Sequence, residues 1–143
     1  MTAAMALSVL LLAGWATPST DVTVNNLSAP GAFELRNDGA AEVSLLRQVA
    51  VERSSGDRWE RVPVPLELIE HCGETSTGRC VRLAAGAVLR PLPWDGYSCA
   101  PQCPGSCRAN VYLGPGKFRI VATSCDGKRQ FKGPEFMLPA PSQ

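Results

Sequence analysis

The chain has 143 residues, of which 19% are charged and 45% hydrophobic, and its formal net charge at pH 7 is +1. A chain of this length fits a single domain with a modest core. Its near-neutral charge excludes a strong overall electrostatic attraction to nucleic acid or to membrane surfaces.

Residues 1–16 predict an export signal. They carry no charged side chain and include the apolar run from Ala6 to Ala13, which is followed by small residues that end at Ala16. The run is shorter than the about 20 apolar residues that a membrane-spanning helix needs, and it is typical of a cleaved signal peptide. We therefore expect a signal at 1–16, one mature domain at 17–143 and a secreted or periplasmic location. An uncleaved anchor and a misassigned start codon are the alternatives.

The first half of the mature segment shows the two-residue alternation of β-strands. Strands are expected at Val22–Val24 and at Phe33–Leu35, and the Asn-Asp-Gly sequence at 37–39 predicts a turn after the second of them. No helical period continues for three turns anywhere in the mature segment. The pattern therefore predicts an all-β domain.

A hairpin is predicted in the stretch that begins at residue 49. Val49 and Val51 lead into a Ser-Ser-Gly-Asp turn, and a second apolar run follows it. This returning run contains Pro63 and Pro65, which have no N–H group to donate to a neighbouring strand. We therefore expect the returning strand at the edge of its sheet.

The second half adds further short strands. One short strand is expected before Gly86 and one after it, ahead of the Trp-Asp-Gly sequence at 94–96. A hairpin is predicted over residues 110–125 with its turn at Gly-Pro-Gly, and a last strand carries Phe136 and Leu138. Seven or eight short strands with turns at this spacing predict a β-sandwich of immunoglobulin type, with an open barrel as the alternative.

Three stretches, FELRNDGAAEVSL, LAAGAVLRPLPWDG and LGPGKFRIVA, resemble marks of the bacterial intracellular proteinase inhibitor family and of related immunoglobulin-like modules. The marks are a strand ending in Asn-x-Gly, a Leu-x-x-Gly strand closing on Trp-Asp-Gly, and a Pro-Gly-x-aromatic strand. The chain is also similar to exported Cys-rich proteins of myxobacteria. Because these marks are turn and core residues, the resemblance implies an immunoglobulin-like fold. The inhibitor family is cytosolic and not built on cysteines, and none of its inhibitory residues maps onto a matching motif here.

The sequence CAPQCPGSC spaces three cysteines four residues apart. A helix would bring Cys99, Cys103 and Cys107 onto one face, where their thiolates could bind a metal ion. Pro101 and Pro104 oppose a helix. The paired Cys-x-x-Cys units that mark zinc and redox sites are absent. We therefore expect structural disulfides rather than a metal site or a redox centre.

All six cysteines are expected in disulfides, since an even number in an exported chain is typical of such a framework: Cys72, Cys80, Cys99, Cys103, Cys107 and Cys125. Cys72 and Cys80 flank a polar loop and are expected to close it. Cys107 and Cys125 lie opposite each other if the 110–125 hairpin continues in register. That leaves Cys99 to pair with Cys103. The alternative set pairs Cys99 with Cys107 and Cys103 with Cys125.

Catalytic and metal-binding chemistry finds little support. His71 is the only histidine, whereas a type 1 copper site normally needs two. Glu67, Glu70 and Glu74 lie near it in the sequence, but a solvated surface is the favoured interpretation. No glycine-rich phosphate loop is present and no carboxylate pair stands out. We therefore expect no catalytic residue, no cofactor and no metal ion, and a protein that is not an enzyme.

The segment 108–132 is basic. Its six cations face Asp126 alone: Arg108, Lys117, Arg119, Lys128, Arg129 and Lys132. A basic segment could contact an anionic partner such as an envelope polymer or nucleic acid. Interleaved aromatic residues for base stacking are sparse, so solvated strand ends are the favoured interpretation and no nucleic-acid partner is expected.

Four residues are candidates for contact with a partner. Arg79 and Arg108 each adjoin a cysteine, and a disulfide-constrained loop would display them as a substrate-mimicking inhibitor does. Trp94 and Tyr97 lie beside the cysteine-rich loop and could anchor a partner. For Trp94 a buried position, with its indole N–H bonded to backbone, is the simpler interpretation.

The favoured hypothesis is a non-enzymatic exported module that presents loops 71–80 and 95–108 to a protein or cell-envelope component. The alternative is a secreted peptidase inhibitor that presents a disulfide-constrained loop. No membrane span is expected after the signal is cleaved.

Overall fold

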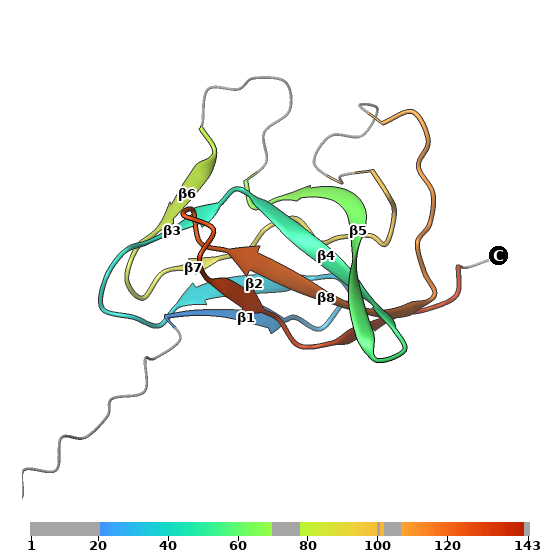
Figure 1. Ribbon diagram of the computed structural model, residues 1–143, viewed down its shortest axis with the longest axis horizontal. Helices are drawn as coiled ribbons and strands as arrows, with labels where there is room; N and C mark the ends of the chain where they lie inside the picture. Colours follow the sequence, from blue (N-terminus) through green and yellow to red (C-terminus); the bar gives the residue numbers. More distant parts are fainter. Residues whose placement is uncertain (1–20, 70–77, 100, 102–106, 142–143) are drawn as a thin grey trace, which may run out of the picture.

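The computed structural model describes residues 21–69, 78–99, 101 and 107–141 (Figure 1). Every regular element among these residues is a β-strand, and each strand pair is antiparallel. The strands are β1 (Val22–Asn26), β2 (Phe33–Asn37), β3 (Val43–Leu46), β4 (Gln48–Ser55), β5 (Arg58–Glu67), β6 (Cys80–Leu83), β7 (Val88–Leu89), β8 (Gly116–Thr123), β9 (Gln130–Lys132) and β10 (Phe136–Leu138). The all-β prediction is confirmed. In this part of the chain no helix is long and apolar enough to cross a membrane, and the expected signal at 1–16 lies outside the described residues.

The described part has more strands than the seven or eight expected, because β3 precedes the predicted hairpin as an additional strand and the last expected strand is interrupted. Only Arg47 separates β3 from β4, and residues 133–135 separate β9 from β10. β9 and β10 pair with two consecutive stretches of β8. They therefore correspond to the single last strand that the sequence predicts.

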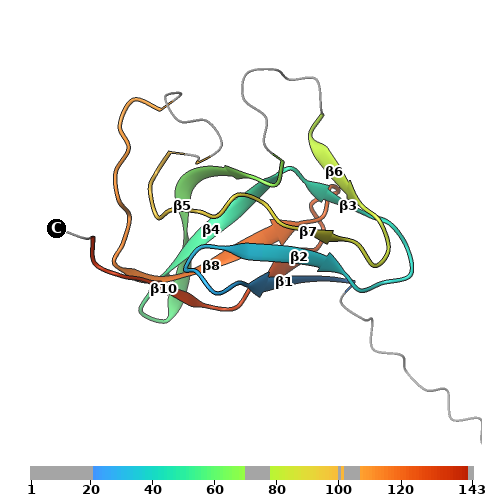
Figure 2. The same ribbon diagram turned by 180° about the vertical axis from the view of Figure 1, so that it is seen from behind.

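Two larger sheets and one short ladder make up the fold, as the view from behind shows (Figure 2). One sheet has the order β1-β2-β7, and the other has the order β10-β8-β4-β5 with β9 also paired to β8. The short ladder joins β3 to β6. A bridge between Leu45 and Ser124 links β3 to the chain that follows β8. The chain thus passes from the ladder into the larger sheet at Arg47.

The β4–β5 hairpin agrees with the sequence prediction. Ser55 pairs with Arg58 across a two-residue turn, in which Gly56 has a φ of +67°. This left-handed conformation favours glycine and suits the twist of a tight hairpin. β5 lies at the edge of its sheet, as Pro63 and Pro65 indicated.

The hairpin predicted over residues 110–125 is wrong. Tyr112, which precedes the Gly-Pro-Gly segment, pairs with Tyr97 rather than with β8. One side of β8 is occupied by β4, and the other side by β9 and β10. Residues 110–113 therefore have no free edge of β8 to pair with. Residues 114–116 connect them to β8 without forming a hairpin turn.

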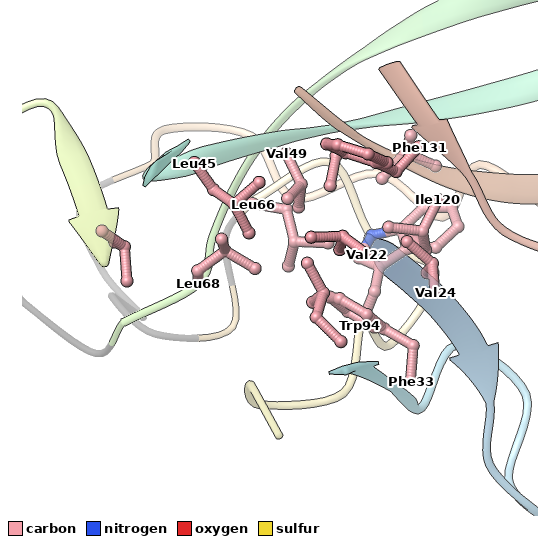
Figure 3. Packing of buried hydrophobic residues seen from close by; sticks show 14 of the residues in the cluster. Val22, Val24, Phe33, Leu45, Val49, Leu66, Leu68, Trp94, Ile120 and Phe131 are labelled. Carbon is pink, nitrogen blue, oxygen red and sulfur yellow. The ribbon is translucent and has the colours of Figure 1, made fainter. Parts of the chain in front are cut away.

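The hydrophobic core draws its side chains from both larger sheets (Figure 3). Alternation buries Val49 and Val51 on β4 and Phe118 and Ile120 on β8. Trp94, which lies outside the strands, is 0% exposed and is the largest of the fully buried side chains. The buried interpretation of Trp94 is therefore confirmed, and its candidate role as a surface contact for a partner is wrong.

Asn37 is a fully buried polar residue at the end of β2. Its Nδ2 donates to the carbonyl oxygens of Ala41 (2.8 Å) and Leu83 (3.0 Å), and its Oδ1 accepts from the N–H of Gly39 (3.0 Å). Three hydrogen bonds satisfy most of what a buried amide needs. Asn37 thereby ties the β2–β3 connection to the end of β6.

Candidate functional site

Two disulfides join the cysteines of the described residues. Cys80 pairs with Cys125 at a Cα–Cα distance of 5.8 Å, and Cys99 pairs with Cys107 at 5.6 Å. No cysteine of the described residues is free. The first disulfide joins the start of β6 to the chain that follows β8, and the second closes a short loop. Disulfides are typical of proteins in an oxidising compartment.

The pairing differs from the first expectation for Cys80 and Cys125. Because these two residues pair with each other, the expected Cys72–Cys80 and Cys107–Cys125 disulfides are wrong. The physical reason lies in the β3 region, where the N–H of Cys125 donates to the carbonyl oxygen of Ser44 (2.9 Å). Residues 124 and 125 therefore lie beside β3, the strand that pairs with β6, and not opposite Cys107.

The expectation was also wrong for Cys99–Cys103, since Cys99 pairs with Cys107. The alternative set was right for Cys99–Cys107 and wrong for Cys103–Cys125. The chain after Cys107 returns along residues 96–99, which brings the Cys99 and Cys107 sulfurs together. Cys72 and Cys103 lie outside the described residues.

Residues 96–99 and 107–113 form a two-stranded structure that we call the stem. The N–H of Ser98 donates to the carbonyl of Val111 (2.9 Å), and the N–H of Leu113 donates to the carbonyl of Gly96 (2.8 Å). Side chains add bonds, because the N–H of Cys99 donates to Asn110 Oδ1 (3.1 Å) and the N–H of Val111 donates to Ser98 Oγ (3.0 Å). Hydrogen bonds and a disulfide therefore hold the stem in one shape.

The stem is fixed to the core through aromatic side chains. The indole N–H of Trp94 donates to the carbonyl oxygen of Tyr97 (2.8 Å), and the Trp94 ring meets the Phe118 ring edge-to-face at 5.1 Å between centroids. The Tyr97 and Tyr112 rings lie 5.2 Å apart across the stem. Gly96 has a φ of +88°, and a Cβ there would lie 2.7 Å from the Tyr112 ring. Only glycine permits this close packing.

The outer surface of the stem carries the residues that a partner can reach. Arg108 and Asn110 are exposed, and Val111 is 56% exposed; among the described large apolar side chains only Met137, at 59%, is more exposed. Tyr97 and Tyr112 are half-buried. The structure thus brings the sequence candidates Tyr97 and Arg108 to one stem and adds Val111 and Tyr112. Val111 and Tyr112 belong to the apolar run that predicts the first arm of the 110–125 hairpin, and such a run does not indicate which of its residues are exposed.

Arg79 is exposed but lies on another element, directly before β6. Its carbonyl oxygen accepts a hydrogen bond from the N–H of Arg47 (2.9 Å). The structure therefore does not bring Arg79 to the stem, and its backbone is already engaged by the β3–β4 connection.

The cations of the basic segment are partly neutralised by acids from other strands. Lys117 lies 3.4 Å from Glu135, Arg119 Nε lies 2.6 Å from Glu52, and Arg129 lies 3.1 Å from Asp21. Opposite charges at these distances cancel much of the local potential. This arrangement supports the interpretation of the segment as solvated strand surface.

Two carboxyl groups away from the stem have altered acidity. A hydrogen bond from Arg90 Nε (3.0 Å) is the main cause that lowers the pKa of Glu34. The hydroxyl of Ser124 donates to Asp126 (2.6 Å), and this bond is the main cause that lowers the pKa of Asp126. Both groups are held as carboxylates, and neither is a raised-pKa acid of the kind that serves in general acid catalysis.

The acidic stretch around the only histidine is mostly outside the described residues, which exclude Glu70, His71 and Glu74. Glu67 is described, and its carboxylate lies 3.4 Å from Arg47. Within the described ranges, no three His, Cys, Asp or Glu side chains gather as a metal-binding group.

Searches of known proteins found no matching family model, curated protein or solved structure.

Proposed function

We propose that this protein is an exported, non-enzymatic binding module with an immunoglobulin-like β-sandwich fold. The signal-like sequence at 1–16 and the two disulfides support export. A core with side chains from both larger antiparallel sheets supports the sandwich architecture. The stem is the surface that we assign to a protein or cell-envelope partner.

The observation that carries this proposal is the exposure of Val111 on a braced stem. The Cys99–Cys107 disulfide and the bonds to Ser98 hold the backbone before any partner arrives. A preorganised loop loses less conformational entropy on binding than a flexible one. The stem also carries Tyr97 and Tyr112, and tyrosine is enriched at the centres of protein interfaces.

A capture experiment with matched variants tests the proposal. The mature protein is immobilised and exposed to envelope extracts of the producing cells, and bound proteins are identified by mass spectrometry. Val111→Asp places a charge on the stem, and Val88→Asp places the same charge at a site that is 40% exposed on β7. A specific partner should bind the wild type and Val88→Asp but not Val111→Asp. Equal capture by both variants, or no specific capture, rejects the stem as a binding surface.

A second candidate function is inhibition of a peptidase by Arg108. The residue is exposed and adjoins Cys107, whose disulfide constrains the loop. A substrate-mimicking arginine must place its carbonyl oxygen in the oxyanion hole of the enzyme. Among the described residues, none donates a hydrogen bond to the carbonyl of Arg108, whereas the carbonyl of Arg79 is bound by Arg47. Arg108 is therefore the better of the two sequence candidates.

Titration against trypsin-like and subtilisin-like peptidases distinguishes this function. Arg108→Ala should abolish inhibition of a trypsin-like enzyme, while Arg79→Ala should retain it. Absence of inhibition by the wild type at micromolar concentration rejects the second candidate and leaves the binding proposal standing.

A further inference from the structure

A groove of about 390 Å³ lies between β4 and β5, away from the stem. It is bounded by residues of β4 and β5 with contributions from the ends of β3 and β8: Leu46, Gln48, Val49, Ala50, Arg61, Val62, Pro63, Val64, Pro65 and Thr123. Gln48, Ala50 and Thr123 alternate with the buried Val49, Val51 and Ala122. Their side chains therefore face away from the core, on the outer surface of the sheet.

The groove results from an irregularity in strand pairing. Val49 pairs with Leu66 and Val51 pairs with Val62, so the three residues 63–65 of β5 stand opposite Ala50 alone. Pro63 and Pro65 have a fixed φ and no N–H for the ladder, which suits them to a bulge. β5 bends along its length in Figure 1. The bulge in β5 thus shapes the groove.

The groove is lined by one charged side chain, by polar uncharged side chains and by apolar side chains. Arg61 is the only charged residue among the lining residues, and Gln48 and Thr123 contribute an amide and a hydroxyl. Pro63, Pro65 and the half-buried Val62 give an apolar wall. A guanidinium donates several hydrogen bonds in a planar fork and accepts none. The lining is therefore complementary to an acceptor-rich anion that is attached to an apolar body.

Arg61 is available for such a ligand because its cross-strand neighbour is occupied. Glu52 lies directly opposite Arg61, but its carboxylate contacts Arg119 Nε at 2.6 Å. Arg119 in turn lies over the Trp59 ring, with Cζ 4.3 Å from the centroid, which fixes it on Glu52. No acid of the described residues forms an ion pair with Arg61.

We propose that this groove binds a small organic carboxylate with an apolar body, through an ion pair with Arg61 and apolar contact with Pro63 and Pro65. The groove volume lies at the lower end of the range of small-molecule sites, about 300–1,000 Å³. Such a ligand is a free acid or the C-terminal residue of a peptide, and both present the same carboxylate. The proposal is independent of the stem and of its partner.

The probe is N-acetyl-leucine, with N-acetyl-leucinamide as the matched neutral compound. Amide chemical shifts of the ¹⁵N-labelled mature protein are followed during titration. N-acetyl-leucine should shift the amides of residues 48–50, 61, 62, 64 and 123 in a saturable way, and the neutral amide should bind more weakly. Arg61→Gln should weaken binding by up to about fivefold, the upper end for one exposed charge contact. Arg58→Gln, an exposed arginine at the hairpin turn, should leave affinity unchanged.

A titration of a pentapeptide that ends in leucine distinguishes the two sources of the carboxylate. Tighter binding than N-acetyl-leucine identifies a chain terminus, and equal or weaker binding identifies a free acid. The proposal is overturned if N-acetyl-leucine gives no saturable shifts, if the neutral amide binds equally well, or if Arg58→Gln weakens binding as much as Arg61→Gln does.

Discussion

The indole N–H of Trp94 donates a 2.8 Å hydrogen bond to the carbonyl oxygen of Tyr97, and this bond joins the largest core side chain to the stem. Trp94→Phe removes the donor and part of the buried ring, and it leaves the half-buried carbonyl of Tyr97 without this partner. We expect the free energy of unfolding to fall by about 2–4 kcal/mol, measured by urea denaturation. Trp59→Phe, on the half-buried outer surface of β5, should cost less than about 1 kcal/mol. Equal losses for the two variants would mean that Trp94 does not anchor the stem.

Asn37→Ala tests the buried amide at the end of β2. The change leaves the N–H of Gly39 and the carbonyl oxygens of Ala41 and Leu83 without their partner. We expect a loss of about 2–4 kcal/mol in the free energy of unfolding, because buried unpaired groups retain their desolvation penalty. Asn25→Ala on β1 is the control and should change stability by less than about 0.5 kcal/mol. A small effect at Asn37 would show that the β2–β3 connection is held by other contacts.

Local sequence signals predicted those parts of the fold that adjacent residues decide. The Ser-Ser-Gly-Asp turn selected the β4–β5 hairpin, and Pro63 and Pro65 marked β5 as an edge strand. Both features depend on backbone conformation and hydrogen-bond donors within a few residues. The burial of Trp94 followed from its size and from the need of its N–H for a partner.

The pairing of distant strands could not be predicted in the same way. Residues 110–113 and β8 are close in sequence and both apolar, which favours a hairpin. In the structure, however, both edges of β8 pair with other strands, namely β4 on one side and β9 and β10 on the other. The hairpin register predicts Cys107 opposite Cys125, whereas the observed pairing places Cys107 beside Cys99. The exposure of Val111 depends on the same long-range choice, because alternation marks apolar residues but not which of them the rest of the chain covers.

Peptide mapping under non-reducing conditions should recover Cys80 linked to Cys125 and Cys99 linked to Cys107. Recovery of Cys72 linked to Cys80, or of Cys107 linked to Cys125, would contradict the arrangement of β6 beside β3. The same digest reports whether Cys72 and Cys103, which these two disulfides leave over, are oxidised.

Removing each disulfide separately should have unequal effects. The sequence separation is 45 residues for Cys80–Cys125 and 8 for Cys99–Cys107. In the chain-entropy model these loops correspond to about 4 and about 2.5 kcal/mol of stabilisation. The double variant Cys80→Ala/Cys125→Ala should therefore lose more stability in urea than Cys99→Ala/Cys107→Ala. The second variant should instead lose partner capture by the stem, and the reverse order of both effects would contradict these roles.

Arg90→Gln should make the stability of the protein less dependent on pH in the acid range. The hydrogen bond from Arg90 lowers the pKa of Glu34 from its ordinary value of 4.5. A carboxyl whose pKa is lower in the folded state contributes stability that is complete above its unfolded pKa and is lost as the pH falls through the folded pKa. The thermal midpoint of the wild type should therefore exceed that of Arg90→Gln at neutral pH, and the difference should shrink below pH 4.5.

Arg36→Gln is the matched control, because Arg36 lies 3.7 Å from Glu34 and is a smaller cause of the same shift. A difference between wild type and Arg90→Gln that stays constant down to the acid limit would assign the role of Arg90 to packing rather than to the charge of Glu34.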